Sequence, residues 1–204
     1  MTGDNLKPKS MAMSKHGEIV TLESGLESRT SVQEMWAGMK IVSQKGAATL
    51  HFDGACRNNP NGPAGYGFHI KRDDNADELI RGYGYAGMNR TGNEVEYMGL
   101  LEGLIWATRL DLKRLTIKDD SELIIRQMKG EYQVRESRLQ AFYAQVLALV
   151  QRGVEANLVC NFIHIPRDKN TIADCLANLG IDTRENVVAC NWAHVNKLMS
   201  RKRN

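Results

Sequence analysis

Apolar residues between positions 47 and 181 follow two periods, one typical of strands and one typical of helices. Three short apolar segments bounded by turn residues come first, and the glycine- and asparagine-rich loop 56–65 separates the first two. Helical and strand periods then alternate, and Gly130, Gly153 and Gly180 mark helix ends. The predicted strands are 48–55, 66–71, 79–86, 114–118 and 156–165, and the predicted helices are 93–109, 120–129, 136–152 and 170–180.

The order βββαβααβα predicts an α/β domain at residues 47–181. We expect a mixed five-stranded sheet, with three antiparallel strands followed by two parallel ones, flanked by helices. Residues 1–46 are expected to be a partly disordered extension with one short helix around Val32–Met39. Residues 182–204 are expected to form a C-terminal extension with a helix at 186–199 and the basic end Arg201-Lys202-Arg203.

Composition is that of one soluble domain with appended tails. The chain has 204 residues, of which 42% are hydrophobic and 25% charged. No run approaches the roughly 18 apolar residues that a membrane helix needs, so we expect no membrane partner. The four cysteines show neither a CxxC pair nor zinc spacing, which is typical of reduced thiols. We therefore expect an intracellular monomer, cytoplasmic or nuclear, with an organelle not excluded.

Charge is unevenly distributed along the chain. The formal net charge is +3, but residues 47–181 carry sixteen Lys and Arg against seventeen Asp and Glu, so the excess lies in the tails. A domain that bound nucleic acid by electrostatics alone would be more basic than this. The balance favours an acidic site embedded in a basic surface.

Four acids lie at the junctions between predicted elements: Asp53, Glu96, Asp120 and Asp174. Each one alone is typical of a helix cap or a strand end. The helix face of Glu96 continues through Gly99 and Gly103, and two glycines inside a helix are tolerated where another backbone approaches closely. Glu96 should therefore point inward, where an acid without a basic partner is unfavourable unless it binds a cation.

Four segments resemble the four motifs of the type 1 ribonucleases H, in the same order and on the same kinds of element. They are residues 53–67 (DGACRNNPNGPAGYG), 91–104 (TGNEVEYMGLLEGL), 119–130 (DDSELIIRQMKG) and 164–178 (HIPRDKNTIADCLAN). The resemblance covers residues 48–181 and implies a ribonuclease H-like fold. It also implies an endonuclease that cuts the RNA strand of RNA·DNA hybrids and leaves 5′-phosphate and 3′-hydroxyl ends.

The same resemblance assigns the metal site. It implies that Asp53, Glu96, Asp120 and Asp174 hold two Mg²⁺ ions, for which Mn²⁺ would substitute. Mg²⁺ prefers carboxylate and water oxygens, and two such ions can clamp an in-line displacement at phosphorus. Asp119 is a rival for the third position, but the Asp-Ser pair of the motif favours Asp120.

Hybrid recognition in the family uses the first-motif loop and the start of the long helix. The residues implied here are Cys56, Asn58, Asn59, Thr91 and Asn93, which would contact sugars and base edges in the shallow groove. We further expect phosphate contacts from Arg126, Lys129 and Arg167.

The chain departs from the family pattern at three places. Gly92 stands where the second motif usually has Asn, which puts one groove contact in doubt, and the first-motif loop is slightly altered at Asn58 and Asn61. No His occurs between Pro166 and Asp174, where many members carry one. Arg167 is the candidate substitute, whereas His51 and His164 are interpreted as structural.

Two alternatives remain open from the sequence. One is a ribonuclease H-like fold that serves as a nucleic-acid-binding or structural subunit of a larger complex. The other is a nuclease of looser substrate choice that also cuts double-stranded RNA. Subunits of the first kind usually lose carboxylates, and this chain keeps all four.

Overall fold

The computed structural model describes residues 9–13, 19–23, 46–74, 78–110 and 112–189. Its central sheet has the strand order β2-β1-β8-β5-β4-β3-β6-β7. The first three domain strands, β3 (Gly46–Cys56), β4 (Pro63–Arg72) and β5 (Glu78–Met88), form the predicted antiparallel meander. The next two, β6 (Leu112–Asp119) and β7 (Val159–His164), add in parallel beside β3. The predicted mixed α/β class is confirmed.

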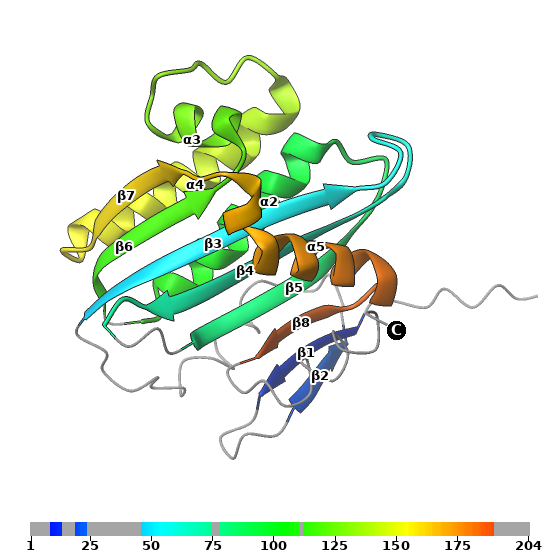
Figure 1. Cartoon of the computed structure of the whole chain (residues 1–204), viewed down its shortest axis with the longest axis horizontal. Coiled ribbons are helices and arrows are strands. Elements are labelled where there is room, and N and C mark those ends of the chain that lie inside the picture. The colour runs from blue at the N-terminus through cyan, green and yellow to red at the C-terminus, as the bar shows by residue number, and fades with distance from the viewer. Residues whose placement is uncertain (1–8, 14–18, 24–45, 75–77, 111, 190–204) are drawn as a thin grey trace, which may run out of the picture.

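The predicted count of five strands is wrong, because three further strands extend the sheet beyond β5 (Figure 1). β8 (Asn186–Ala189) pairs antiparallel with β5, and β1 (Lys9–Met13) pairs with β8 and with β2 (Ile19–Glu23). Without β8, the backbone groups along that edge of β5 would lack partners. The predicted helix 186–199 is therefore wrong at its start, and its remainder and the helix around Val32–Met39 lie outside the described residues.

Helices cover the two faces of the sheet. Figure 1 shows α2 (Gly92–Ala107) and α4 (Ser137–Glu155) behind the sheet and α5 (Thr171–Thr183) in front of it. The short helix α3 (Glu122–Met128) follows β6, and the turn η1 (Arg167–Lys169) precedes α5. No described helix combines the length and the apolar character that crossing a bilayer requires.

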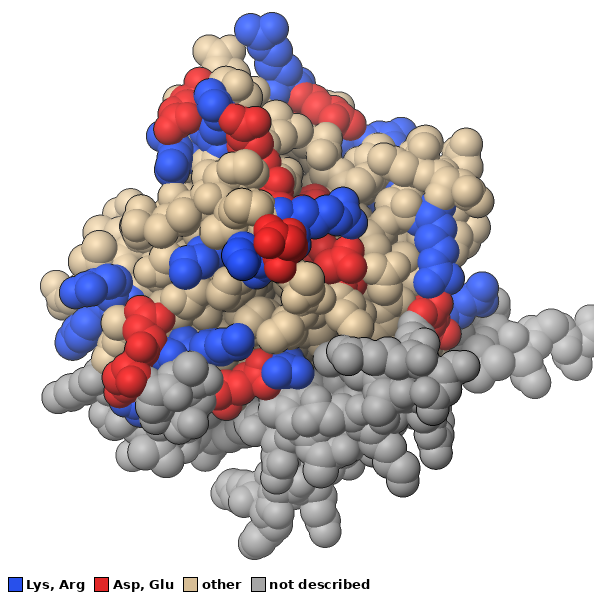
Figure 2. Space-filling view, viewed as in Figure 1, with Lys and Arg blue, Asp and Glu red and all other residues tan. Residues whose placement is uncertain are grey.

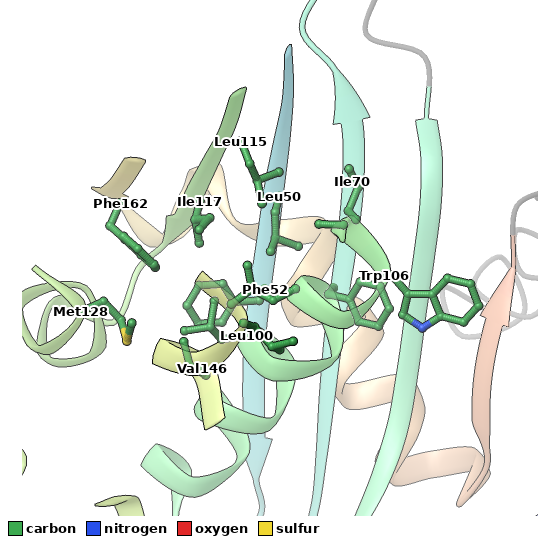
Figure 3. Close-up of a cluster of buried hydrophobic side chains, with 14 of the residues drawn as sticks. Leu50, Phe52, Ile70, Leu100, Trp106, Leu115, Ile117, Met128, Val146 and Phe162 are labelled. Carbon is green, nitrogen blue, oxygen red and sulfur yellow. The ribbon is translucent and has the colours of Figure 1, made fainter. Parts of the chain in front are cut away.

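The main core lies between the sheet and α2 and α4. Figure 3 shows Leu50 and Phe52 of β3 and Leu115 and Ile117 of β6 packed against Leu100 of α2 and Val146 of α4. Their positions two residues apart follow the period of a strand. A smaller cluster under α5 is formed by Tyr83, Leu176, Leu179 and Val187. The two cores hold α2 and α5 on opposite faces of the same strands.

Glycines let both helices approach the sheet closely. A Cβ on Gly99 of α2 would lie 2.9 Å from the backbone oxygen of Asp53, and a Cβ on Gly67 of β4 would lie 2.5 Å from the nitrogen of Ala177 in α5. Contacts this short exclude any side chain. The prediction that the glycine face of α2 packs tightly on the sheet is confirmed.

Candidate active site

Asp53 and Glu96 are brought together by the contact between β3 and α2. Gly54 follows Asp53, and a Cβ there would lie 2.3 Å from the backbone nitrogen of Glu96. Asp53 is buried, and its Oδ1 accepts a hydrogen bond from the backbone N–H of Gly54 at 2.8 Å. The start of α2 is fixed by a capping box, in which Thr91 and Glu94 satisfy each other's backbone N–H groups. Glu96 thus enters the site from a helix that is held in place by its capping box and by its contact with Gly54.

The end of β6 contributes two adjacent acids that differ in burial. Leu115, Ile117 and Asp119 are all buried, so Asp119 continues the core-facing side of the strand. Asp120 follows it and is half-buried. One carboxylate oxygen each from Asp53, Glu96 and Asp119 lies within 4.8 Å of the others. The rival residue Asp119 therefore joins the compact cluster.

Asp174 comes from the first turn of α5 and completes the set. Its Oδ1 accepts from a guanidinium nitrogen of Arg167 at 3.1 Å. Asp120 and Asp174 both raise the pKa of Asp53 through their negative charges, which places them close to it. All four predicted carboxylates thus occupy one neighbourhood, and Asp119 is a fifth.

Burial and mutual repulsion hold protons on this cluster. Burial first, and then the charges of Asp120 and Asp174, raise the pKa of Asp53 to about 7. Burial and neighbouring carboxylates also raise the pKa values of Glu96 and Asp119 well above their usual range. The Oε2 atom of Glu96 is buried and has no hydrogen-bond partner among the described residues. Several carboxylate oxygens lie close together here, and one of them is buried without a hydrogen-bond donor. Such a set of oxygen ligands fits a hard divalent cation such as Mg²⁺.

Asp53→Asn is expected to stabilise the metal-free protein, and more so at higher pH. The folded-state pKa of about 7 lies above the ordinary value of 3.8, so the folded protein keeps a proton that the unfolded chain has lost. The contribution of Asp53 to stability therefore falls as pH rises from about 4 to about 7. The variant should gain free energy of unfolding relative to the parent over this window, on the order of 3 kcal/mol. Urea unfolding of both proteins in EDTA at pH 5 and pH 8 measures this. The same difference in free energy of unfolding between variant and parent at the two pH values would contradict it.

The expected hybrid-binding residues of the first two motifs lie next to each other. The Cys56 thiol donates to the backbone oxygen of Arg90 at 3.0 Å, and Asn59 Oδ1 accepts from the backbone N–H of Gly92 at 3.1 Å. Asn58 is exposed and adopts a left-handed backbone with φ of 55°. Thr91 and Asn93, at the start of α2, are half-buried. The loop 56–65 and the start of α2 thus form one continuous surface.

Gly92→Asn is expected to tighten hybrid binding and to raise the preference for hybrid over double-stranded RNA. A Cβ at this position would meet only Asn59 Nδ2, at 3.4 Å, so the side chain has room. One added hydrogen bond is worth roughly 0.5–1.5 kcal/mol, which corresponds to about 2- to 10-fold in affinity. Gly92→Ala is the matched control, because it adds the Cβ without the amide. Equal affinities of the two variants would mean that position 92 lies outside the contact surface.

The remaining basic candidates lie on two separate elements. Arg167 is exposed on η1 beside Asp174. Arg126 on α3 is paired with Glu122 at 2.6 Å and stacks on Tyr132, and Lys129 is exposed at the end of that helix. On the face shown in Figure 2, Asp and Glu side chains lie among Lys and Arg side chains. The contacts of Arg126, Lys129 and Arg167 with phosphates stay predictions.

None of the three histidines in the described residues belongs to the carboxylate cluster. His51 and His69 stack with ring centroids 4.7 Å apart, and burial first lowers the pKa of His51 to about 4 and that of His69 to about 2. The Nε2 atom of His164 lies 3.2 Å from the backbone oxygen of Asp120. The charges of Asp174, Asp120 and Asp53 raise the pKa of Arg167 further, so Arg167 stays charged. It cannot release and take up a proton near neutral pH, as a His would.

Sequence reasoning missed one residue of the site. Asn170 is almost completely buried, and its Nδ2 atom contacts both Asp119 and Asp120. The only signal in the sequence was an Asn just before a predicted helix, which is also what an ordinary helix cap looks like.

Comparison with known proteins places this geometry in a family. Residues 32–180 match the model of the reverse transcriptase-like family. The chain is 35% identical over 144 residues to the bifunctional protein Rv2228c of Mycobacterium tuberculosis, a match that covers 71% of this chain and 36% of that protein. The chain therefore spans about a third of the length of this relative.

Solved structures agree with that match. The N-terminal ribonuclease H domain of Rv2228c superposes with a TM-score of 0.62 at 33% identity, covering 69% of this chain and 96% of that one. Ribonuclease H1 of Halobacterium salinarum gives a TM-score of 0.61 at 28% identity, with 68% and 99% covered. LC11 ribonuclease H1, isolated from compost and solved with an RNA/DNA hybrid, gives 0.59 at 37% identity, with 67% and 97% covered. On this evidence the chain belongs to the type 1 ribonuclease H family.

Proposed function

We propose that this protein is an endonuclease that hydrolyses the RNA strand of RNA·DNA hybrids, leaving 5′-phosphate and 3′-hydroxyl ends. The observation that carries the proposal is the convergence of five carboxylates from β3, α2, the end of β6 and α5. The solved complex of LC11 ribonuclease H1 with an RNA/DNA hybrid supports the substrate class.

The residues proposed to hold two Mg²⁺ ions are Asp53, Glu96, Asp120 and Asp174, and Mn²⁺ should substitute. When bound, these ions polarise the reacting phosphate and make water a better nucleophile. The carboxylates position them, because Asp53 and Glu96 are fixed by the contact between β3 and α2 and Asp174 by Arg167. Bound cations would also offset the repulsion from neighbouring carboxylates that raises the pKa values of Asp53 and Glu96.

The protein's other residues would hold the substrate. Cys56, Asn58, Asn59, Thr91 and Asn93 lie on one surface beside the carboxylates and offer hydrogen-bonding groups to sugars and base edges. Arg167 stays charged next to Asp174, where its guanidinium would attract the phosphate that is to be cleaved.

The substrate class is tested by cleavage of three labelled duplexes of one sequence in Mg²⁺: an RNA·DNA hybrid, double-stranded RNA and double-stranded DNA. We expect cleavage of the RNA strand of the hybrid and of neither other duplex. Comparable cleavage of double-stranded RNA would replace the proposal with a broader nuclease. Tight binding of the hybrid without cleavage would replace it with a binding subunit.

A further inference from the structure

Asn170 joins three parts of the site through one amide group. It stands between η1 and α5 and is 1% exposed. Its Nδ2 atom, which carries two N–H groups, lies within hydrogen-bond distance of three acceptors: the backbone oxygen of Phe52 at 2.8 Å, Asp119 Oδ1 at 3.1 Å and Asp120 Oδ1 at 2.7 Å. The start of α5, the middle of β3 and the end of β6 therefore meet at this side chain.

The amide of Asn170 does not serve the helix that follows it. Asn170 is the N-cap residue of α5, but its side chain makes no capping hydrogen bond. An ordinary Asn cap accepts an N–H of the first helical turn through its oxygen. Here the amide nitrogen is instead directed at two carboxylates and a strand carbonyl, so the side chain contacts the site and does not cap the helix.

Asp119 and Asp120 differ in how many of their carboxylate oxygens accept a hydrogen bond. Asp119 accepts on both oxygens, from Asn170 Nδ2 on Oδ1 and from the backbone N–H of Ser121 on Oδ2 at 3.1 Å. Asp120 accepts on Oδ1 from Asn170, and its Oδ2 has no donor among the described residues. Asp119 is thereby fixed in the interior, and Asp120, whose charge acts on Asp53, keeps one oxygen available.

We propose that Asn170 is a positioning residue that sets the geometry of Asp120 for metal binding by holding the Asp119–Asp120 pair. Two adjacent carboxylates repel each other and the acids around them, so the half-buried Asp120 would turn toward solvent without a donor to hold it. Groups that orient metal ligands from behind typically contribute 10- to 100-fold to metal affinity. This inference rests on the proposed metal-dependent function of the same site.

The test measures metal binding in the absence of substrate. Asn170→Ser removes the amide but keeps a side chain that is a favourable helix N-cap, and Asn170→Ala removes the side chain beyond Cβ. The matched control is Asn178→Ala, because Asn178 Nδ2 also donates from α5, but to the backbone oxygen of Asp174 and not to a carboxylate. Mn²⁺ binding to the full chain is measured by calorimetry at pH 7.5, and thermal unfolding in EDTA identifies the variants that fold.

We expect Mn²⁺ to bind 10- to 100-fold more weakly to Asn170→Ser and Asn170→Ala, and within twofold of the parent to Asn178→Ala. Lowered thermal stability with unchanged Mn²⁺ affinity in a folded Asn170 variant would overturn the inference, because a purely structural role would give that result. The readout is independent of cleavage. If the parent cuts no hybrid but the affinities differ as expected, the proposed function fails and the positioning role stands. If the parent cuts the hybrid but the Asn170 variants bind Mn²⁺ as tightly as the parent, the positioning role fails and the proposed function stands.

Discussion

Asp53→Asn is expected to lower the rate of RNA cleavage by several orders of magnitude while leaving the affinity for hybrid nearly unchanged. Asp53 is buried, has a carboxylate oxygen within 4.8 Å of those of Glu96 and Asp119, and feels the charges of Asp120 and Asp174. The amide would keep the shape of the side chain but lose the charge that holds divalent ions. Affinity should persist because phosphate and sugar contacts dominate binding.

Single-turnover cleavage and equilibrium binding of the same labelled hybrid measure these two quantities separately. Asp168→Asn is the matched control, because Asp168 is an exposed acid on η1 that pairs with Lys169 at 3.6 Å. Cleavage by Asp53→Asn at the parent rate would show that Asp53 is not a ligand. A parallel loss of affinity and rate would mean that Asp53 acts in binding the hybrid.

Asp120→Asn is expected to reduce cleavage far more than Asp119→Asn. Asp119 shares the compact cluster with Asp53 and Glu96, but both of its oxygens already accept hydrogen bonds from neutral donors. Asp120 is half-buried, keeps an oxygen available and raises the pKa of Asp53 by its charge. Asp119→Asn should cost at most about tenfold in rate, because a neutral amide preserves much of its packing while removing one repulsion.

The same single-turnover assay ranks these two variants, with Mg²⁺ varied so that weakened binding and slowed chemistry are separated. A larger loss in Asp119→Asn than in Asp120→Asn would shift the register of the third motif by one residue. Asp119, and not Asp120, would then be the ligand at the end of β6, in agreement with its place in one cluster with Asp53 and Glu96.

The acids were predictable because they lie where elements meet. Asp53 lies near the end of a strand, Glu96 lies in the first turns of one helix and Asp174 in the first turn of another. The glycines at 99 and 103 indicated which helix face approaches the sheet. These signals are local in sequence. The packing of α2 and α5 on the same strands then brings the acids together. The succession of strands and helices along the domain followed from the alternation of periods for the same reason.

The parts that sequence reasoning missed depend on contacts between distant segments. β8 has only four residues, and its two valines fit the first turn of a helix equally well until the free edge of β5 is known. The placement of Asp119 depends on which face of β6 meets the core, and a shift of one residue reverses that face. Asn170 is 118 residues from Phe52 and 51 from Asp119, so no local pattern could connect them.

Metal dependence and the chemistry of the cut ends test the central claim most directly. The measurement is cleavage of a hybrid with 5′-labelled RNA in Mg²⁺ and in excess EDTA, followed by analysis of the product termini. The proposed mechanism predicts cleavage in Mg²⁺ and none in excess EDTA. It also predicts that cleavage returns when Mn²⁺ is added in excess of the EDTA, and that the products have 5′-phosphate and 3′-hydroxyl ends. Undiminished cleavage in EDTA, or products with 2′,3′-cyclic phosphate ends, would contradict it.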